Sequence, residues 1–595
     1  MTEHAKSRWF FLVVLECDNL LVRICALPFK KWASRVVLLL LLALTLLARC
    51  HNRASVFHDG GVYFLDGDCY SRMTRAKMVT EGHWIIRHHD FENWPQGITP
   101  HTTAPLDWLI VGLKSVVDGA FKFGLAPGAK AYQTQSLDVA GAFISPLLGV
   151  LTAAWLWWWA RQMRLHFRAA MVLLFALSPI AVHGTVLGRP DHQSLLIFLL
   201  AIALGGELRL MRSKDAGEKS RHAWSIMTGF AWGFAIWVSL YEPLLVLAPV
   251  ILTRLIFERK NLLAPGQRMQ WFAPLGFLGL IFLIEGWRVE VPNAALRESF
   301  ARWSEGIGEL RHLDPTGSLL WEWLGLLVLI APVMLCLAGR VDRRAFAVLA
   351  GVVLLFGLTV WQLRWGYFLL LAFAMSVPWL LRAFRNEVVA WAAFAVGLVP
   401  IGMAWSRTLH PTEKAAEDHA WRQMSQTRLR TIAAKMKAGP RAGFLAPWWM
   451  SPQLAYWSGQ PGIAGSSHQS LPGTLDAARF YVSTDGEKAA EILRERKVGW
   501  VIADNASFDV TQRDRLLAIT NSETVLGVRA GEEPLAYLLA EHPRQAPKFL
   551  REVAPNELGL VADFAPKEGR TVENQGMRIY ATQMHRLYRV ELKEP

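Results

Sequence analysis

The sequence predicts a mainly α, polytopic membrane protein with about eleven transmembrane helices and a C-terminal α/β domain outside the membrane. Three observations predict this fold class. Of the 595 residues, 53% are hydrophobic and 27 are tryptophan, which is too apolar for an ordinary soluble protein of this length. Long apolar runs alternate with polar segments through the first two thirds of the chain. Basic residues concentrate in every second polar segment, as the positive-inside rule requires.

The apolar runs approach the roughly 20 residues that cross a bilayer core. The first follows Lys30, Lys31 and Arg35 and lacks a small-residue cleavage site, so we expect no cleavable signal peptide. Residues 8–29 are expected to form an interfacial helix. The expected spans are residues 36–49, 137–160, 169–186, 193–208, 223–240, 242–257, 271–286, 318–338, 345–363, 366–381 and 388–405.

The basic loops set the expected orientation in a cell inner membrane. They place the N-terminus in the cytoplasm and the C-terminal domain in the periplasm. We therefore expect a transmembrane domain over residues 1–405 and a periplasmic domain over 406–595. The net charge of +14 follows this topology, so it indicates no nucleic-acid partner. The outer loops of the first domain are residues 50–135, 187–192 and 287–317.

The C-terminal domain shows both helical and strand patterns. Residues 427–436 and 487–497 are expected to form amphipathic helices, and 441–447 and 498–504 short buried strands. None of the five cysteines lies in this domain, so disulfides do not build it. A disulfide between Cys50 and Cys69, both on the outer side, stays an open alternative.

Ionisable residues gather in the outer loops. Asp66 and Asp68 follow the first span, and Asp191 lies where a later span begins. Acids at that depth are costly unless they are paired, solvated or bound to an ion, so they mark a candidate site. Two carboxylates from different loops, with an imidazole or amide nearby, suit a hard divalent cation such as Mn²⁺ or Mg²⁺. The alternative is structural, with Asp191 only capping a helix.

The third outer loop adds a further acidic stretch. Glu305, Glu309 and Asp314 lie there, and alone they are also compatible with a polar surface turn. A transporter would instead carry charged or broken helices near the middle of the membrane. The loop acids therefore favour an enzyme over a non-catalytic transporter or scaffold.

Three short outer-loop motifs resemble those of the oligosaccharyltransferase catalytic subunits, membrane glycosyltransferases of the C-type fold. DCYSRM at 68–73 is similar to the Asp-x-Tyr motif of the family's first outer loop. GRPDHQ at 188–193 resembles its second-loop Asp-x-Glu or Asp-His-His motif. GIGE at 306–309 looks like its Ser-Val-x-Glu or Thr-Ile-x-Glu loop.

Two later matches follow in the family's order. Arg364, at the outer end of a span, resembles the arginine that meets the lipid pyrophosphate. WWMSPQLAYWSGQP at 448–461 resembles the frame of the Trp-Trp-Asp-Tyr-Gly-Tyr signature. Each motif is short and degenerate, but the five together extend from the first outer loop into the C-terminal domain.

The resemblance implies an inverting transfer of a sugar from a polyprenyl phosphate or pyrophosphate. Asp68 and Glu309 would be catalytic, and Arg364 would meet the donor phosphate. The metal ligands would be Asp68 and Asp191 with His192 or Gln193. Trp448, Trp449 and Met450 would line the acceptor site, and Asp66, Tyr70, Arg72 and His101 would support these groups.

Two positions depart from the family pattern. Met450 stands where the family has an acid that recognises the hydroxyl of Asn-x-Ser/Thr, and methionine accepts no strong hydrogen bond. Gln193 stands where the family has Glu or His, so its oxygen would coordinate a cation without charge. We therefore expect a membrane-embedded glycosyltransferase with a glycan, lipid or non-sequon protein acceptor. The alternative is a protein N-oligosaccharyltransferase in which another residue replaces the lost acid.

Overall fold

The structure, a computed structural model, describes most of the chain. The described residues are 30–100, 103–125, 127–211, 218–259, 263–286, 288, 296–504, 533–558, 573–574, 577–578 and 585–592. The expected interfacial helix over 8–29 and the candidate His101 lie outside these ranges.

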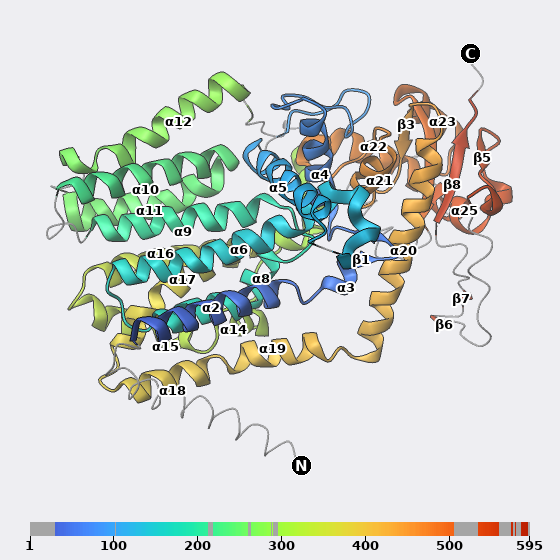
Figure 1. Cartoon of the computed structure of the whole chain (residues 1–595). Helices are drawn as coiled ribbons and strands as arrows, with labels where there is room; N and C mark the ends of the chain where they lie inside the picture. The colour runs from blue at the N-terminus through green and yellow to red at the C-terminus, as the bar shows by residue number, and fades with distance from the viewer. Residues whose placement is uncertain are drawn as a thin grey trace, which may run out of the picture.

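Each expected span falls on a helix or on two consecutive helices, which lie side by side in Figure 1. They are α2 (Lys30–Arg49), α6 (Ser136–Gln162), α7 (Arg168–Leu177) with α8 (Pro179–Thr185), α9 (His192–Leu210), α10 (Glu218–Val238), α11 (Tyr241–Glu258), α12 (Met269–Glu285), α14 (Ser318–Leu324) with α15 (Leu327–Gly339), α16 (Arg344–Trp361), α17 (Gly366–Arg382) and α18 (Glu387–Gly397) with α19 (Val399–Leu409).

By length and composition alone, fewer of these helices qualify as membrane spans. Among the described residues, six helices are long and apolar enough to cross a membrane, or up to eight if each bent pair is one span. The bends lie between α7 and α8, at 65°, and between α14 and α15, at 57°. Pro179 cannot donate a backbone hydrogen bond, and Gly325 has a positive φ of 72°, so each residue suits a helix break.

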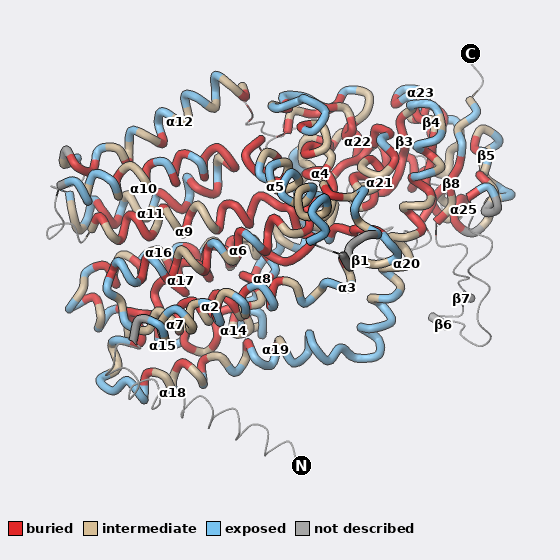
Figure 2. Tube along the Cα trace, in the orientation of Figure 1, coloured by how far each residue is buried: buried red, intermediate tan, exposed pale blue. Residues whose placement is uncertain are grey.

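The burial pattern agrees with a bundle in lipid (Figure 2). In α17, 89% of the apolar window is buried inside the protein, whereas in α2 and in α18 with α19 the values are 22% and 28%. Apolar helices that expose leucine and valine need a lipid solvent, because water would penalise that surface. The mainly helical, polytopic fold class is confirmed.

Outer-loop elements lie between the bundle and the C-terminal region (Figure 1). The first outer loop carries α4 and α5, and its end leads directly into α6. These elements are α3 (Arg53–Val56), β1 (Phe57–His58), β2 (Gly61–Val62), α4 (Gly67–Thr80), α5 (Pro105–Lys122), η1 (Pro127–Gln135), α13 (Arg297–Glu305), η6 (Gly308–Leu310) and η7 (Leu363–Trp365). The short η4 (Pro265–Gln267) instead connects α11 to α12.

The C-terminal region is an α/β unit, as expected. A four-stranded sheet has the order β3-β4-β8-β5, with β3 and β4 parallel and the other neighbours antiparallel. The elements are α20 (Glu413–Lys437), β3 (Gly443–Leu445), α21 (Ser451–Ser458), η8 (His468–Ser470), α22 (Leu471–Val482), α23 (Gly486–Glu495), β4 (Val498–Asp504), α25 (Leu535–Glu541), η11 (Pro543–Gln545), β5 (Leu550–Glu552), η12 (Pro555–Leu558), β6 (Glu573–Asn574), β7 (Met577–Arg578) and β8 (His585–Val590).

Polar contacts fasten the C-terminal region to the outer loops. The Tyr456 hydroxyl on α21 donates to the Asp138 carboxylate on α6. Arg496 donates to the side chains of Asn93 and Gln96 at 3.1 and 2.5 Å. These contacts join segments more than 300 positions apart and fix the domain against α6 and the first outer loop. Cys50 and Cys69 are free thiols.

Candidate functional site

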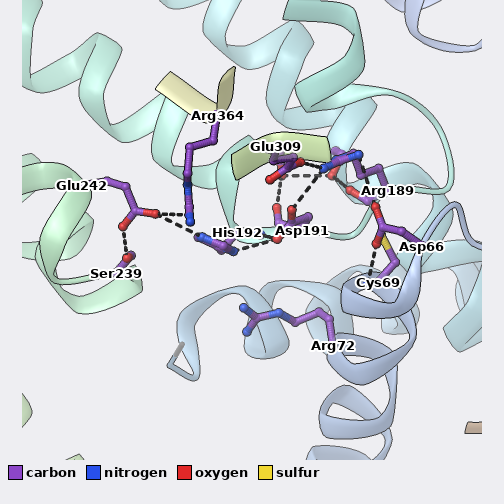
Figure 3. Close-up of polar contacts among 12 residues, drawn as sticks. Asp66, Cys69, Arg72, Arg189, Asp191, His192, Ser239, Glu242, Glu309 and Arg364 are labelled. Carbon is purple, nitrogen blue, oxygen red and sulfur yellow. Dashed lines mark hydrogen bonds and ion pairs between the residues drawn. The ribbon is translucent and has the colours of Figure 1, made fainter. Parts of the chain in front are cut away.

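The outer-loop acids meet where α4, the loop before α9, and η6 converge (Figure 3). Asp66 and Asp68 come from the start of α4, Asp191 from the residue before α9, and Glu309 from η6. We call these four residues the carboxylate cluster. Segments far apart in the chain thus supply four carboxyl groups to one place at the end of the bundle that faces the C-terminal region.

The α4 helix places two of these acids in its first turn. The Asp66 carboxylate caps the helix by accepting from the Cys69 backbone N–H at 3.0 Å. The surrounding protein raises the pKa of Asp68 to about 7 by reducing its hydration, even though the side chain stays open to solvent. The nearby carboxylates of Asp66, Asp191 and Glu309 add to this rise.

The turn before α9 positions Arg189 and Asp191. Gly188 has a φ of +77°, and a Cβ there would lie 2.7 Å from a Val56 methyl, so this position needs glycine. Asp191 caps α9 through the His192 backbone N–H at 2.6 Å, so the structural role considered from the sequence is real. Burial would raise the pKa of Asp191, but contacts with His192 and Arg189 hold it well below its usual range.

His192 and Gln193 both lie against the Asp191 carboxylate. The His192 Nδ1 is 2.7 Å from Asp191 Oδ1, and its Nε2 is 3.6 Å from Glu242 Oε1. The Gln193 amide faces the same carboxylate, and with its nitrogen turned toward it donates to Oδ1 at 2.8 Å. His192 is therefore occupied on both ring nitrogens, and the Gln193 nitrogen is occupied by the same carboxylate.

Two neighbouring side chains hold the Glu309 carboxylate in the cluster. Its carboxylate accepts from the Tyr367 hydroxyl at 3.0 Å and pairs with the Arg189 guanidinium. Burial alone would raise the pKa of Glu309, but the Arg189 charge lowers it below its usual value. Asp314 is exposed and caps its own turn through Thr316, so it stands apart from the cluster. Glu305 lies at the end of α13, and within the described ranges it forms no ion pair with Arg189 or Arg364.

Arg364 reaches the site from η7, and its partner is an acid that the sequence analysis missed. The Arg364 Nη2 lies 2.6 Å from Glu242 Oε1, and Glu242 is buried at the start of α11. The Ser239 hydroxyl also donates to Glu242. In Figure 3, dashed lines join Glu242 to both Arg364 and His192, so Glu242 links the candidate phosphate-binding arginine to the residue beside Asp191.

The supporting residues expected from the sequence divide into two groups. Asp66 lies in the cluster, where its Oδ2 is 3.2 Å from the Arg189 Nη1. Tyr70 is buried in the core, where its hydroxyl accepts from the Phe64 backbone N–H at 3.1 Å. Arg72 is buried and pairs with Asp107 at 2.9 Å, so its charge is largely committed there.

The tryptophan pair and Met450 have different environments. The Trp448 ring packs edge-on against Trp303 of α13 with centroids 5.6 Å apart, and it also contacts the Trp449 ring with centroids 5.8 Å apart. Met450, by contrast, is 4% exposed and lies in an apolar cluster with Phe444 and Trp500. Trp448 thus touches the third outer loop, whereas the Met450 side chain is directed into the interior of the C-terminal domain.

A loop of the C-terminal domain also reaches the carboxylate cluster. The Ser466 hydroxyl hydrogen-bonds the Asp68 carboxylate and lies 3.3 Å from the Ser71 hydroxyl. Ser71 in turn donates to Glu92 at 2.6 Å, and Glu92 accepts from the Ser467 backbone N–H at 3.4 Å. The domain therefore contributes a polar group directly to Asp68.

The donor set suits a hard cation, although the acids do not form a closed cage. Within the described ranges, no three acidic, imidazole or thiol groups are arranged as a complete metal site. Asp68 nevertheless has a raised pKa, faces solvent and has no ion-pair partner among the described residues. A cation beside Asp68 and Asp191 would relieve the repulsion between the carboxylates, and an amide oxygen such as that of Gln193 would be a neutral ligand.

Three residues of the site escaped the sequence analysis: Arg189, Glu242 and Ser466. Glu242 carried a usable signal, because an acid at the mouth of a span is costly without a partner. Arg189 lies inside the GRPDHQ stretch but before the three residues that resemble the Asp-x-Glu or Asp-His-His motif. No sequence feature pointed to Ser466, since its contact with Asp68 depends on how two distant segments dock.

Comparison with known proteins gives sequence and structural relatives. No protein-family model matches the chain. A curated relative, dolichyl-phosphooligosaccharide-protein glycotransferase 1 of Archaeoglobus fulgidus, is 25% identical over 264 residues. That alignment covers 42% of this chain and 40% of the relative, so less than half of either protein is matched.

Solved structures extend the likeness to most of the fold. The apo crystal structure of the Archaeoglobus fulgidus oligosaccharyltransferase has a TM-score of 0.60 at 14% identity, over 84% of this chain and 73% of that one. Its complex with zinc and sulfate has a TM-score of 0.53 at 16% identity, over 81% and 70%. This chain is therefore similar in sequence to an archaeal oligosaccharyltransferase and shares its fold, that of the C-type membrane glycosyltransferases.

Proposed function

We propose that this chain is a membrane glycosyltransferase that moves a sugar or oligosaccharide from a polyprenyl-phosphate or pyrophosphate donor to an acceptor. The observation that carries the proposal is the proximity of Arg364 to the carboxylate cluster, to which it is linked through Glu242 and His192. Acids able to hold a cation and an arginine able to meet phosphate are the two requirements for stabilising a phosphate leaving group. The dolichyl-phosphate-linked donor in the name of the sequence relative supports the same donor class.

Asp68 and Asp191, with the Gln193 oxygen, would hold a divalent cation, Mg²⁺ or Mn²⁺. When bound, the cation would supply positive charge to the leaving phosphate. The complex of the related archaeal enzyme with zinc and sulfate supports a metal requirement. We assign His192 to positioning Asp191 instead of to ligation, because carboxylates face both of its ring nitrogens.

The other residues divide between donor and acceptor. Arg364 would pair with the donor phosphate, for which it must exchange at least part of its contact with Glu242. Glu309 would position the acceptor nucleophile, and Asp68 would accept its proton. Attack opposite the leaving phosphate forms the new glycosidic bond, breaks the bond from the anomeric carbon to the phosphate oxygen, and inverts the configuration.

We infer an acceptor other than a standard Asn-x-Ser/Thr peptide, namely a glycan, a lipid or a non-sequon protein. Met450 supplies no acceptor for a hydroxyl hydrogen bond, and its burial leaves Trp448 and Trp449 as the accessible part of this motif. The alternative of a sequon-dependent protein N-oligosaccharyltransferase requires another polar group nearby. Ser466 is the candidate, because its hydroxyl already touches the cluster.

The proposed setting is the outer face of a cell inner membrane. The basic loops support a cytoplasmic N-terminus, a transmembrane domain over 1–405 and a periplasmic domain over 406–595. In this orientation the carboxylate cluster faces the periplasm at the level of the lipid head groups. A lipid-linked donor would then reach Arg364 from within the outer leaflet.

The test is a transfer assay with purified protein and a radiolabelled polyprenyl-phosphate sugar. We expect release of free polyprenyl phosphate and label in acceptor from native membranes, loss of both in excess chelator, and recovery with Mg²⁺ or Mn²⁺. Asn-x-Thr and Asn-x-Ala peptides should serve about equally, or not at all. Transfer at full rate by Asp191→Asn in chelator would overturn the metal-assisted mechanism, and a strong preference for Asn-x-Thr would favour the sequon-dependent alternative.

A further inference from the structure

Arg189 occupies a central position among the acids of the site. Its guanidinium lies 3.2 Å from Asp66 Oδ2 and 3.7 Å from Asp191 Oδ2, and it pairs directly with Glu309 Oε1. The side chain is only 6% exposed. Arg189 is therefore a fixed positive charge in contact with three of the four members of the carboxylate cluster (Figure 3).

The backbone around Arg189 restrains it in this position. Gly188 provides the positive φ that turns the chain, and the Gly188 N–H donates to the Ala142 carbonyl at 3.0 Å. The Arg189 carbonyl accepts from the Ser145 hydroxyl and from the Asp191 N–H, the latter at 2.7 Å. Because its backbone is fixed on both sides, Arg189 can leave the acids only by rotating its side chain.

The charges around Arg189 do not balance. The cluster holds four carboxyl groups, and Arg189 and His192 supply two positive charges in direct ion pairs, so part of the negative charge stays uncompensated. Asp191 is shared, because it contacts Arg189 and is also one of the two acids proposed to hold the cation. Arg189 and a divalent ion would therefore both bind Asp191, and their positive charges repel each other.

We propose that Arg189 is a resident cation that competes with the divalent metal for the carboxylate cluster and so sets the metal affinity of the site. This inference rests on the proposed metal site and goes beyond it, because it assigns a role to a residue that is not a ligand. Arg189 is a positioning residue. It stabilises Asp66, Asp191 and Glu309 together when no metal is bound, and it weakens metal binding by its own charge.

The two possible roles of Arg189 predict opposite changes in metal affinity. If Arg189 competes with the metal, removing its charge must tighten metal binding. If Arg189 only orients Asp191 as a ligand, its removal must weaken binding. A unit charge a few ångströms from a divalent ion in a partly solvated site is worth about one to a few kcal/mol, so we expect a change of about tenfold or more.

The experiment measures Mn²⁺ binding to the purified full-length protein without any donor or acceptor, by the loss of the free Mn²⁺ electron paramagnetic resonance signal. Arg189→Gln should lower the Kd by about tenfold or more relative to the unmodified protein. Arg189→Lys keeps the charge, but its single ammonium cannot contact three carboxylates at once, so its Kd should lie between the two. The Lys variant also keeps the inference testable if Arg189→Gln does not fold.

Matched controls separate this effect from a general loss of charge. Arg441→Gln removes one positive charge from an exposed arginine that pairs with Asp90, and it should leave the Kd unchanged. In an Asp191→Asn background, Arg189→Gln should change the Kd much less, because the shared acid is lost. Unchanged or weaker Mn²⁺ binding by folded Arg189→Gln and Arg189→Lys would overturn the inference. Failure of every variant to bind Mn²⁺ would overturn the proposed metal site as well.

Discussion

Replacing Met450 by aspartate restores the acid of the related motif, but we expect it to destabilise the C-terminal domain instead of improving acceptor recognition. Met450 is 4% exposed and packs among Phe444, Leu454 and Trp500. Truncating a buried methionine costs about 2–5 kcal/mol. An unpaired carboxylate in the same place adds a desolvation cost or remains protonated at neutral pH.

One local effect opposes this loss. Met450 is the N-cap of α21, where aspartate usually contributes about 1 kcal/mol by accepting a backbone hydrogen bond. However, its φ of −100° and ψ of −24° are helical, whereas capping side chains favour an extended backbone. We therefore expect a net loss of about 3 kcal/mol, which lowers the unfolding temperature of a domain of this size by about 6–12 °C.

Thermal unfolding followed by tryptophan fluorescence measures this loss, and the transfer assay measures function. Met450→Leu conserves volume and polarity, so its unfolding temperature should stay within a few degrees of the original, since such exchanges usually cost less than about 1.5 kcal/mol. If Met450→Asp unfolds at the original temperature and gains transfer to Asn-x-Thr peptides, the side chain faces the acceptor and our placement of it is wrong.

Three further substitutions test the site. Asp191→Asn should lower transfer at least about 100-fold while keeping the fold, because asparagine removes the charge but can still cap α9; circular dichroism and initial rates measure the two effects. Glu242→Gln should free Arg364 and lower the donor Kd by about tenfold in a binding assay, and weaker binding would mean that Glu242 orients Arg364. Glu309→Gln should lower kcat at least about tenfold, and normal turnover would exclude it as the acceptor-positioning acid.

Hydropathy and charge predicted the membrane bundle well because its physical cause is local. A helix in lipid satisfies its own backbone hydrogen bonds, so an apolar run of sufficient length is almost enough to predict it. The helix breaks also have local causes, at Pro179 and Gly325. The strands at 443–445 and 498–504 were predictable for a related reason, since both are short and fully or mostly buried.

The site was only partly predictable, because its contacts join distant segments. Asp68 and Asp191 were identifiable as acids at the membrane surface, but the role of Arg189 depends on Glu309, which lies 120 positions later in the chain. Glu242 and Arg364 are likewise 122 positions apart. The burial of Met450 was not predictable either, since the three residues WWM give no indication of which side chain turns inward.

The C-terminal domain is part of the site and not an accessory to it. Its Ser466 hydroxyl contacts Asp68, its Ser467 N–H binds Glu92, and its Trp448 packs on Trp303 near the loop that carries Glu309. These contacts reach both the proposed metal-binding acids and the acceptor side. A relative motion of the domain would therefore change the surroundings of Asp68 and of the Glu309 loop together. The tryptophan pair of the polar region thus has a structural role, because the Trp448 ring attaches the domain to the outer loop that carries Glu309.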